Sequence, residues 1–569
     1  MCGIAGVFSS ILFLEDRKSK LGKMLQAQEH RGPDATQEWH DSQCSLGHNR
    51  LSIIDLSDHA NQPMHSFCGR YVVVFNGEIY NYLEIKKELV PHFQFQTQSD
   101  TEVLLNAYIH WGTDFLHQLN GMFSLAIWDK QEKTLFIARD RFGVKPFYYY
   151  ADAQQFTFAS EIKTLWAAGI SKTPNPKVWA NYLSFGTYGM PNETFWEAIQ
   201  QLPAGHFAVL SQENLTDFKP QRWYDFVSRV QNTPVLEVSE LKARYTALLN
   251  DAIQLRFRAD VPLGMNVSGG LDSSTLIALI HKNLPTTQNI EAFTFYCNDE
   301  NYDELPWVKL LLQDKPYSLN KVLLKAQAIP DLITTLTGNQ DEPFGGFPTL
   351  AYSLLFQEAR NKGVKVLLDG QGMDEAWAGY DYYHNQSNQV IQGVTSSPVR
   401  PEVLVAEFAA LAEKEVYPQP FASPMQNLQY RDLFYTKIPR ALRFNDRISM
   451  LHGTELREPF LDYRLVELAF AQKDSVKYYQ GNTKWLLRQI SQEIVTNQVA
   501  LAPKRPLQTP QREWIANELN AYVSDKIQQF GQLDFVDSKK VQQIWQDYRN
   551  GNQDNSFYIW QWINLVELV

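Results

Sequence analysis

The 569-residue sequence has few cysteines and no spacing that would use them in a zinc site or a disulfide framework. Its four cysteines, Cys2, Cys44, Cys68 and Cys297, are scattered along the chain. No apolar run reaches the roughly 20 residues that a membrane-spanning helix needs. The first residues have no basic segment of the kind that begins a secretory signal. These absences favour a reducing compartment, and we expect a cytoplasmic protein without membrane contact.

Basic residues are fewer than acidic ones. The chain has 52 Lys and Arg against 63 Asp and Glu, which gives a formal net charge of -11. It contains no block of like charges that would mark a binding tail. An acidic chain is repelled by phosphate backbones and anionic lipids, so we expect neither as a partner. Apolar residues make up 44% of the chain, and a chain of this length exceeds one hydrophobic core, so two or three domains are expected.

Short apolar runs dominate the first part of the chain. Residues 71–75, 123–128 and 134–138 have the length and composition of buried strands. Turn signals separate such runs, including Asn76-Gly77 and Phe142-Gly143. A helix is predicted over residues 101–111. This pattern indicates a layered α+β domain with antiparallel sheets.

The pattern changes further along the chain. Residues 262–267 and 364–368 each run from an apolar strand into a glycine turn and then a helix. This order of elements is the unit of a parallel α/β sheet. Helical periodicity dominates beyond residue 400. We therefore expect two domains, residues 1–210 and 235–569, joined by a linker over residues 206–235.

Cys2 directly follows the initiator methionine. A small second residue usually permits removal of Met1, which would leave the thiol beside a free α-amine. The reference pKa of that amine, about 7.7–8.0, lies close to the value of about 8.5 for the thiol, so the amine can accept the thiol proton. The thiolate would attack a carboxamide, form a thioester and release ammonia. An incidental cysteine is the alternative.

Polar residues elsewhere in the first domain suit such a reaction. Arg50 can bind a carboxylate through two hydrogen bonds. The side-chain amide of Asn76 and the backbone N–H of Gly77 are the donors that an oxyanion hole needs. Asp100 can hold a substrate ammonium. Taken singly, these residues have ordinary alternatives: a salt-bridged arginine, an Asn-Gly turn and a helix cap.

Five segments in one order resemble the class II glutaminase domain, which has the αββα sandwich of the N-terminal-nucleophile hydrolases. They are MCGIAG, RGPD, HNRLSIIDL, FNGEIYNY and SDTEVLL. The resemblance implies that Cys2 is the nucleophile and that Asn76 and Gly77 form the oxyanion hole. It also implies a glutamine-binding set: Arg50, Leu51, Ile53, Asn76, Glu78 and Asp100.

Residues 267–274, VSGGLDSS, lie between a predicted strand and a helix that we expect to begin near Ser273. Glycines let the backbone approach an anion closely, and a helix N-terminus directs free N–H groups at it. The segment lacks the Gly-Lys-Ser/Thr end of a Walker A loop. It resembles the pyrophosphate loop of ATP pyrophosphatases, which cleave ATP to AMP and pyrophosphate. A glycine-rich turn without a ligand is the alternative.

A second polar segment, DGQGMDE at residues 369–375, also follows an apolar strand. Two acids beside a polyphosphate favour Mg²⁺, which takes oxygen ligands, and Asp272 and Asp374 are the candidate ligands. Lys484, at a predicted helix start, would neutralise charge on the α-phosphate or the leaving pyrophosphate; a solvated surface lysine is the alternative. The candidate ATP-binding residues are Val267, Ser268, Gly269, Gly270, Asp272, Ser273, Phe295, Asp369 and Gly370.

Together the two halves resemble the glutamine-hydrolysing asparagine synthetase family over nearly the whole chain. The resemblance implies a C-terminal α/β ATP-pyrophosphatase domain with a parallel sheet and additional helices, ATP and Mg²⁺ as cofactors, and Lys484 as a catalytic residue. ATP would adenylate a carboxylate, and ammonia from the Cys2 site would pass through an internal tunnel and displace AMP. The implied partners are glutamine, ATP and a carboxylate acceptor. Homodimers are common in the family.

Two segments depart from the family pattern. Gln371 stands where asparagine synthetases carry a glutamate that is thought to act as a base. Residues 341–348, DEPFGGFP, contain no arginine where those enzymes place Arg- and Thr-bearing residues near aspartate. An acceptor with two carboxylates would favour an arginine. Aspartate and another carboxylate, such as a sugar uronic acid or a cell-wall diaminopimelate precursor, therefore both remain open as acceptors.

Two other function classes are less compatible with these motifs. The intact SGGLDSS segment argues against a glutaminase or transferase with an idle second domain. A scaffold that had lost activity would be expected to have lost site side chains. The chain retains them: Cys2, Arg50, Asn76, Asp100, Asp272, Asp374 and Lys484.

Overall fold

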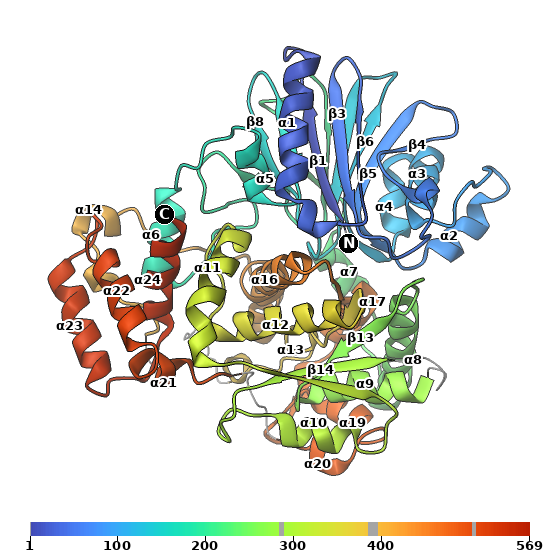
Figure 1. Cartoon of the computed structure of the whole chain (residues 1–569). Helices are drawn as coiled ribbons and strands as arrows, with labels where there is room; N and C mark the ends of the chain where they lie inside the picture. Colours follow the sequence, from blue (N-terminus) through green and yellow to red (C-terminus); the bar gives the residue numbers. More distant parts are fainter. Residues whose placement is uncertain (1, 284–289, 385–396, 503–507) are drawn as a thin grey trace.

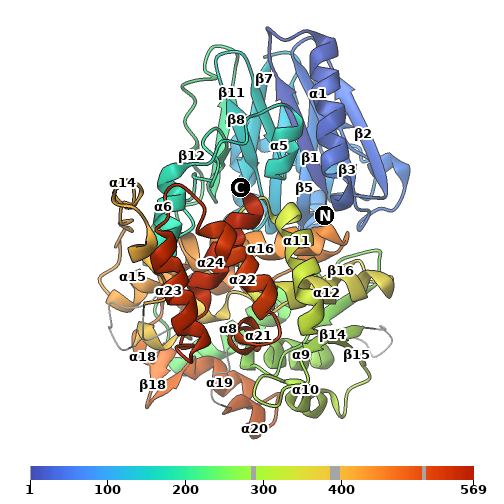
Figure 2. The same ribbon diagram turned by 60° about the vertical axis from the view of Figure 1, so that its left-hand side comes forward.

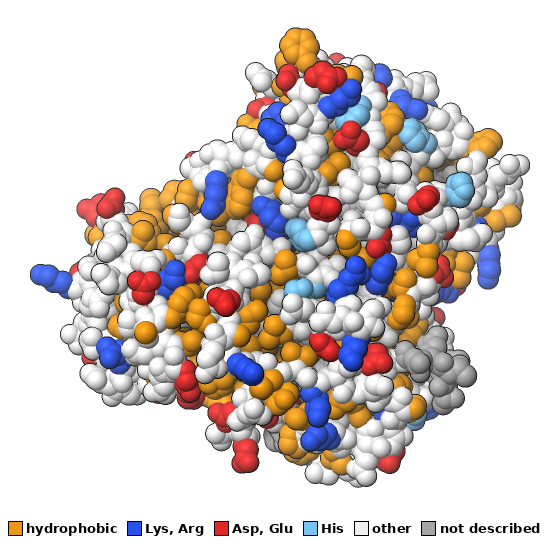
Figure 3. Space-filling view, viewed as in Figure 1, with side chains coloured by type: hydrophobic (Ala, Val, Ile, Leu, Met, Phe, Trp, Pro, Cys, Tyr) orange, Lys and Arg blue, Asp and Glu red, His pale blue; other side chains and the backbone are white. Residues whose placement is uncertain are grey.

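The computed structural model describes residues 2–283, 290–384, 397–502 and 508–569. Strands from the first part of the chain form the upper half of the molecule, and a smaller sheet surrounded by helices forms the lower half (Figure 1). A group of C-terminal helices packs against the side of the lower half (Figure 2). On the face shown in Figure 3, acidic and basic side chains are interspersed rather than gathered by sign.

The upper half contains two six-stranded sheets, ordered β10-β8-β9-β1-β3-β2 and β12-β11-β7-β6-β5-β4. Their pairings are antiparallel, as predicted. The strands are β1 (Gly3–Phe8), β2 (Ala35–His40), β3 (Cys44–Arg50), β4 (Met64–His65), β5 (Tyr71–Ile79), β6 (Gly121–Asp129), β7 (Thr134–Arg139), β8 (Tyr148–Ala151), β9 (Phe156–Ala159), β10 (Gln200–Gln201), β11 (His206–Leu210) and β12 (Gln221–Arg222).

Alternation of side chains along the strands builds four layers. Ile4 of β1 and Val72 of β5 belong to one buried cluster between the two sheets. Their neighbours in sequence point to the opposite faces. Val7 of β1 packs with α1 (Leu14–Ala27), and Val73 of β5 packs with α3 (Asp100–Trp111). The result is the αββα sandwich that the resemblance to the class II glutaminase domain implied. The other helices of this half are α2 (Tyr82–Leu89), α4 (Phe115–Gln118) and α5 (Ile162–Ala167). The helix α6 (Pro176–Phe185) lies beside the C-terminal helices (Figure 1).

The turn predicted at Asn76-Gly77 is wrong. Both residues lie inside β5, where Asn76 pairs with Ser124 and Gly77 pairs with Phe123 of β6. A side chain on Gly77 would bring its Cβ to 2.1 Å from the carbonyl oxygen of Met122. The glycine therefore serves a close approach between two strands. The turn predicted at Phe142-Gly143 is present, with a φ of +70° at Gly143.

The predicted linker over residues 206–235 also differs from the structure. β11 pairs with β7, and β12 pairs with β11, so both extend the second sheet. Ala208 and Leu210 point into the cluster between the sheets. The residues after β11 are polar because this edge of the sheet is exposed to solvent. Their composition therefore does not indicate a strand.

The lower half is built on a five-stranded parallel sheet with the order β15-β14-β13-β16-β17. The strands are β13 (Leu263–Asn266), β14 (Glu291–Tyr296), β15 (Ser318–Leu323), β16 (Val366–Leu368) and β17 (Glu455–Arg457). β13 and β16 are the two strands that the glycine turns predicted. The strand order reverses between them, and ligands of open α/β sheets bind at such a switch point, beyond the carboxyl ends of the strands.

Helices surround this sheet and dominate beyond residue 400, as predicted. The helix after the first glycine turn, α9 (Leu271–Asn283), begins two residues before the predicted start at Ser273. The others are α7 (Phe226–Asn232), α8 (Val238–Arg256), α10 (Leu305–Leu312), α11 (Ile329–Gln340), α12 (Phe347–Asn361), α13 (Met373–Ala376), α14 (Ala406–Ala409), α15 (Pro424–Phe434), α16 (Lys437–Leu451), α17 (Tyr463–Ala471), α18 (Asp474–Lys477), α19 (Trp485–Ser491), α20 (Asn497–Ala500), α21 (Gln511–Ala516), α22 (Asn520–Phe530), α23 (Ser538–Arg549) and α24 (Phe557–Leu568). In the described part of the chain, no helix has the length and apolar character needed to span a membrane.

Candidate active sites

The first candidate site lies where β1 begins and where β3 and β5 end. Cys2 directly precedes β1, and its backbone N–H donates to Oδ1 of Asn76 at 3.0 Å. Its Sγ lies 4.0 Å from the carbonyl oxygen of Leu51, the residue after β3. Strand pairing thus brings together three predicted residues that are far apart in the sequence. Met1, whose removal we predicted, lies outside the described residues.

The Cys2 side chain is buried, with 8% of its surface exposed. Burial raises the pKa of its thiol, because a thiolate is poorly solvated there. The thiol is therefore neutral near pH 7 unless a base takes its proton. Any nucleophilic role for Cys2 requires such a base close by.

Asn76 offers an unused hydrogen-bond donor beside Cys2. Its Oδ1 accepts from Cys2, whereas its buried Nδ2 has no hydrogen-bond partner among the described residues. Buried donors are normally satisfied, so an exception calls for an explanation. An oxyanion that forms during attack on a substrate carbonyl would supply the missing acceptor.

Arg50 ends β3 and is 6% exposed. Its Nη1 donates to the carbonyl oxygen of Ser57 at 2.7 Å and to Oδ1 of Asn61 at 2.8 Å. Among the described residues, no carboxylate lies within ion-pairing distance of its guanidinium. The alternative of an ordinary salt-bridged arginine therefore does not apply. Its Nη2 donates to the carbonyl oxygens of Ile54, at 3.4 Å, and of Asp55, so the partners of both Nη atoms are neutral groups.

Two buried acids complete this site. Oδ2 of Asp100 accepts from the backbone N–H of Ile79 at 2.9 Å, and burial raises the pKa of Asp100 to about 6. The cap of α3 is Ser99, so Asp100 is not the helix cap of the alternative interpretation. Burial, and then the nearby charge of Glu455, raise the pKa of Glu78. Ile53, the last predicted member of the glutamine-binding set, is buried, and its carbonyl oxygen accepts from the backbone N–H of Asp260.

The second candidate site is a cavity of about 340 Å³ at the switch point of the parallel sheet. The loops after β13 and β16 form its walls, and Lys484 closes one side. The predicted residues that line it are Ser268, Gly269, Gly270, Asp272, Ser273, Asp369, Gly370, Asp374 and Lys484. Val267 and Phe295 line an adjoining cavity instead, together with Tyr302 and Tyr352.

The glycine loop is held in shape by its own hydroxyl groups. The backbone N–H of Ser268 donates to Oγ of Ser273 at 3.2 Å, and the N–H of Gly270 donates to Oγ of Ser268 at 3.3 Å. A side chain on Gly269 would bring its Cβ to 2.7 Å from Cβ of Trp307. The 13-residue helix α9 follows at once, so its free N–H groups point into the cavity.

Lys484 lies between two carboxylates of the cavity. Its Nζ is 2.6 Å from Oδ2 of Asp272 and 2.6 Å from Oδ1 of Asp374. The lysine is 6% exposed, and although burial lowers its pKa, the two acids raise it above the usual value. It adopts a left-handed backbone conformation with a φ of +53°, which is uncommon for a residue other than glycine. These features exclude the alternative of a solvated surface lysine.

Gly379 makes this arrangement sterically possible. A Cβ at position 379 would lie 2.0 Å from Oδ1 of Asp374 and 2.3 Å from Cε of Lys484. The sequence offered no signal for this role, since the contact depends on a residue more than 100 positions away.

The two predicted metal ligands offer the carboxylate oxygens that a hard cation prefers. Asp272 and Asp374 direct carboxylate oxygens at one position, now held by the Lys484 ammonium, and Mg²⁺ prefers such oxygens. Within the described ranges, no group of three or more His, Cys, Asp or Glu residues could hold a metal. These two acids fit a magnesium ion whose remaining ligands are phosphate and water oxygens.

Several cavity residues escaped sequence reasoning: Glu304, Tyr352, Glu375, Tyr380 and Arg488. Glu375 is the most informative of them. It is fully buried, and its Oε1 accepts from the hydroxyl of Tyr380 at 2.9 Å. Burial, and then the charge of Asp374, raise the pKa of Glu375 to about 7.

None of residues 341–348, expected near the acceptor, lines the cavity at the switch point. Glu342 is buried against the first domain, where it accepts from the N–H of Phe195 at 3.0 Å. It also accepts from Nη1 of Arg443 at 2.9 Å, so α16 supplies the arginine that the segment lacks, and Glu342 neutralises it. The place of this segment relative to the acceptor stays a prediction.

Comparison with known families assigns both halves. The glutamine amidotransferase domain family matches residues 1–224, and the asparagine synthase family matches residues 244–568. The chain belongs to the asparagine synthase family. It is accordingly a carbon–nitrogen ligase that takes nitrogen from glutamine. The predicted pair of folds, an N-terminal-nucleophile hydrolase and an ATP pyrophosphatase, is confirmed.

Relatives within this family cover nearly the whole chain. Glutamine-hydrolyzing asparagine synthetase 1 of Bacillus subtilis (strain 168) is 28% identical, over 98% of this chain and 95% of that protein. A putative asparagine synthetase of Mycobacterium tuberculosis (strain ATCC 25618 / H37Rv) is 30% identical, over 96% and 92%. Amidase chry2 of Gibberella zeae is 25% identical, over 90% and 88%. Proteins similar to this chain thus carry different names, and membership of the family leaves the acceptor open.

Proposed function

We propose that this family member uses ATP to activate a carboxylate and then amidates it with ammonia that Cys2 releases from glutamine. The arrangement of Lys484 between Asp272 and Asp374, above the glycine loop, carries this proposal. The same chain also holds the buried thiol of Cys2. Beside that thiol, Nδ2 of Asn76 is a hydrogen-bond donor with no partner among the described residues, as an oxyanion hole would need.

The glutaminase half-reaction follows from the contacts of Cys2. Once Met1 is removed, the backbone nitrogen of Cys2 is the α-amine, held by Oδ1 of Asn76. It takes the thiol proton, and the thiolate attacks the amide carbon of glutamine to give a tetrahedral oxyanion, which Nδ2 of Asn76 and the N–H of Gly77 stabilise. The α-ammonium returns its proton to the amide nitrogen, the C–N bond breaks, and ammonia leaves a thioester on Cys2. Water then hydrolyses the thioester to glutamate and frees the thiol.

Charge complementarity would hold glutamine in place during these steps. The guanidinium of Arg50 binds its α-carboxylate, since no described carboxylate competes for that charge. Asp100 and Glu78 hold its ammonium group. Binding of an ammonium group favours the ionised form of both acids, which burial alone disfavours.

The synthetase half-reaction would use the cavity at the switch point. The glycine loop and the N-terminus of α9 bind the triphosphate, and the nucleoside extends toward Phe295. An oxygen of the acceptor carboxylate attacks the α-phosphorus, and pyrophosphate leaves. Lys484 stabilises the charge that develops there. Asp272 and Asp374 would hold Mg²⁺, which supplies further charge neutralisation on the pyrophosphate.

Glu375 is the residue that can replace the missing family base. Ammonia that attacks the acyl-adenylate must lose a proton, and the amide of Gln371 cannot accept it. The pKa of Glu375, about 7, suits proton transfer near neutral pH, and Tyr380 holds one of its oxygens. Glu375→Gln is expected to lower ammonia-dependent amide formation by about 10²–10⁴-fold. ATP–pyrophosphate exchange should persist; its equal loss would contradict this role.

A small cavity at the domain boundary supports internal passage of ammonia. Its volume is about 20 Å³, and both domains line it, with Met122 and Arg141 from one and Arg256 and Glu458 from the other. Ammonia that crosses here avoids bulk water, where it would be protonated. Burial raises the pKa of Glu458 to about 8, so this acid adds little negative charge near neutral pH.

Replacement of Cys2 tests the division into two sites. Cys2→Ala should abolish steady-state product formation with glutamine and should preserve it with an ammonium salt as the nitrogen source. Cys68→Ala, at an exposed cysteine, is the matched control and should retain both activities. If the ammonia-dependent reaction is lost together with the glutamine-dependent one, the assignment of separate sites is wrong.

The identity of the acceptor is the open part of this proposal. Aspartate is the simplest choice, in line with the names of the B. subtilis and M. tuberculosis relatives. Gln371 and the similarity to an amidase favour another carboxylate.

A further inference from the structure

Two acids of the switch-point cavity, Asp374 and Glu375, lie on α13, a helix of only four residues. A helix this short has no stability of its own and depends on contacts with its surroundings. Its position decides whether Oδ1 of Asp374 reaches Nζ of Lys484, at 2.6 Å, and where Glu375 lies in the cavity wall. The groups that hold the end of α13 therefore help to place both acids.

A side-chain amide from another helix holds that end. The last four carbonyl oxygens of a helix have no partners within it, and in α13 these are all the carbonyl oxygens there are. Two of them accept from backbone N–H groups of the residues that follow. The other two, of Glu375 and Ala376, accept from Nε2 of Gln429 at 2.6 and 2.9 Å. Gln429 thus caps half of α13 from α15.

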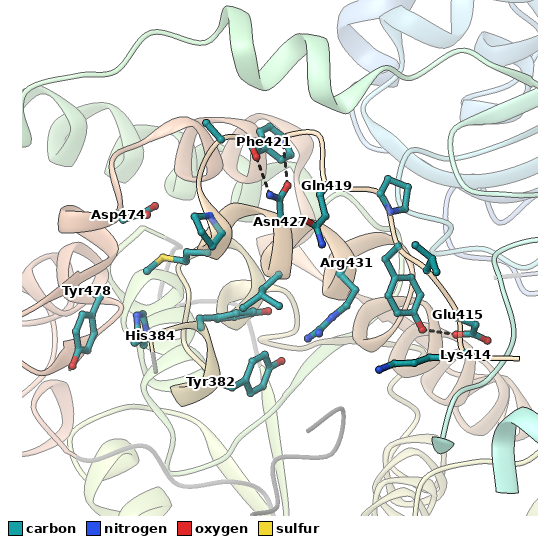
Figure 4. A pocket seen from close by; sticks show the side chains of 18 residues that line it. Tyr382, His384, Lys414, Glu415, Gln419, Phe421, Asn427, Arg431, Asp474 and Tyr478 are labelled. Atoms are coloured by element: carbon teal, nitrogen blue, oxygen red, sulfur yellow. Dashed lines mark hydrogen bonds between the residues drawn. The ribbon is translucent and has the colours of Figure 1, made fainter. Parts of the chain in front are cut away.

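Gln429 lies on the buried face of α15. On the opposite face, Asn427 and Arg431 are one turn apart and line a pocket of about 1000 Å³ (Figure 4). Successive residues of an α-helix are turned by about 100°, so Gln429, two positions from each, points away from that pocket. Its side chain is fully buried, with α13 on one side and α18 on the other.

A buried lysine of α18 fixes the orientation of this amide. Lys477 is fully buried, and its Nζ donates to Oε1 of Gln429 at 3.1 Å and to the carbonyl oxygen of Phe470 at 2.9 Å. Burial lowers the pKa of Lys477 to about 7. Both the ammonium and the neutral amine have the two N–H groups that these contacts need. The amide oxygen therefore faces Lys477, and Nε2 faces α13, in either state.

We propose that Gln429 is a positioning residue of the synthetase site and that Lys477 acts through it. Gln429 does not line the switch-point cavity. It holds the end of α13 so that Asp374 and Glu375 keep their places in the cavity wall. This inference rests on the proposed function, because the work of the two acids in that cavity is part of that proposal.

Gln429→Glu separates the two contacts of Gln429. A carboxylate has the shape of the amide and can still accept from Lys477, but it has no N–H to donate to α13. Ammonia-dependent pyrophosphate release is measured with aspartate, galacturonate and meso-diaminopimelate as acceptors. Its kcat should fall about 10- to 100-fold, since small displacements of reacting groups are costly. The KM for ATP should stay unchanged, because the glycine loop and α9 keep their contacts.

Hydrogen exchange monitors α13 without any substrate. Backbone N–H groups over residues 373–379 should exchange about tenfold faster in Gln429→Glu, because the helix loses two hydrogen bonds at its end. Gln426→Glu is the matched control on the same helix. Nε2 of Gln426 donates to the carbonyl oxygen of Phe470 at 2.8 Å and makes no contact with α13. This variant should keep the wild-type exchange, kcat and KM for ATP.

A double-mutant cycle tests the part of Lys477. Lys477→Met removes the donor to Oε1 of Gln429 and should lower kcat less than Gln429→Met does, because Nε2 can still reach α13. The double variant should have the kcat of Gln429→Met alone, since Lys477 acts on α13 only through Gln429. A further loss of kcat in the double variant would overturn the assignment of Lys477.

The other outcomes are also distinguishable. Wild-type exchange in α13, or wild-type kcat, in Gln429→Glu overturns the inference and leaves the amidotransferase function intact. A raised KM for ATP or a loss of glutaminase activity in that variant indicates a general structural role and also overturns it. Absence of pyrophosphate release by the wild-type protein with every acceptor, with glutamine and with ammonia alike, overturns the proposed function and the inference with it.

Discussion

Arg31 and Asp446 form a bidentate ion pair across the domain boundary, with nitrogen–oxygen distances of 2.8 and 3.2 Å. Nε of Arg31 also donates to the carbonyl oxygen of Cys2 at 3.1 Å. One guanidinium therefore contacts both the candidate nucleophile and α16 of the synthetase domain. A second link is the ion pair between Glu78 and Arg457 of β17, at 3.4 Å. These contacts tie the geometry of the glutaminase site to the other domain.

Asp446→Asn should weaken the contact between the two domains, because it removes the charge that pairs with Arg31. Loss of one partner from a buried ion pair costs about 3–5 kcal/mol, and we expect the lower end because Glu161 stays beside Arg31 at 2.8 Å. Glutaminase kcat should fall and ammonia-dependent synthesis should persist. Denaturant unfolding and steady-state kinetics measure the two effects. Asp525→Asn, at an exposed aspartate of α22, is the control. A variant with wild-type stability and wild-type glutaminase activity would refute the coupling.

Asn76→Asp should separate the two contacts of Asn76. Aspartate keeps an oxygen that can accept from the Cys2 nitrogen but lacks the N–H donor of Nδ2. Loss of one oxyanion-hole donor typically lowers kcat about 10²–10³-fold. We expect that loss in glutaminase kcat and little change in ammonia-dependent synthesis. Retention of glutaminase activity would show that Nδ2 is not the donor.

Glutamine binding should depend on pH through Asp100. Burial raises the pKa of this acid to about 6, so its carboxylate is charged above pH 6 and neutral below it. A neutral carboxyl cannot pair with the substrate ammonium, so the KM for glutamine should rise as the pH falls through about 6. Asp100→Asn should have a high KM without that dependence. The same pH profile in wild type and variant would assign the titration to another group.

Gly379→Ala should disable the synthetase half alone. The added methyl group would lie 2.0 Å from Oδ1 of Asp374 and 2.3 Å from Cε of Lys484, so the two side chains could not keep their contact. Pyrophosphate release should fall to background, and glutaminase activity should remain. Gly338→Ala, in α11, meets nothing within 4 Å and should behave as wild type. Normal pyrophosphate release in Gly379→Ala would contradict the placement of Lys484.

Local patterns in the sequence were sufficient to predict much of the architecture. The short apolar run at residues 71–75 predicted a strand, and two strand–glycine–helix segments predicted β13 and β16, because these features depend on neighbouring residues. The family resemblance, carried by MCGIAG and SGGLDSS, is confirmed by the family matches to both halves. The catalytic and binding roles of Cys2, Asn76, Asp272 and Lys484 remain predictions.

Contacts between residues far apart in the sequence could be identified only from the tertiary structure. Lys484 meets Asp272 across 212 positions, and Arg443 meets Glu342 across 101 positions, and no local periodicity encodes such pairs. Asn76-Gly77 has the composition of a turn but lies in a strand. Position 77 needs a glycine because the backbone of β6 approaches too closely for a side chain there. The sequence thus specifies which chemical groups are present and which segments are strands or helices. Packing decides which of those groups meet, since it brings strand ends and loops to the same place from remote parts of the chain.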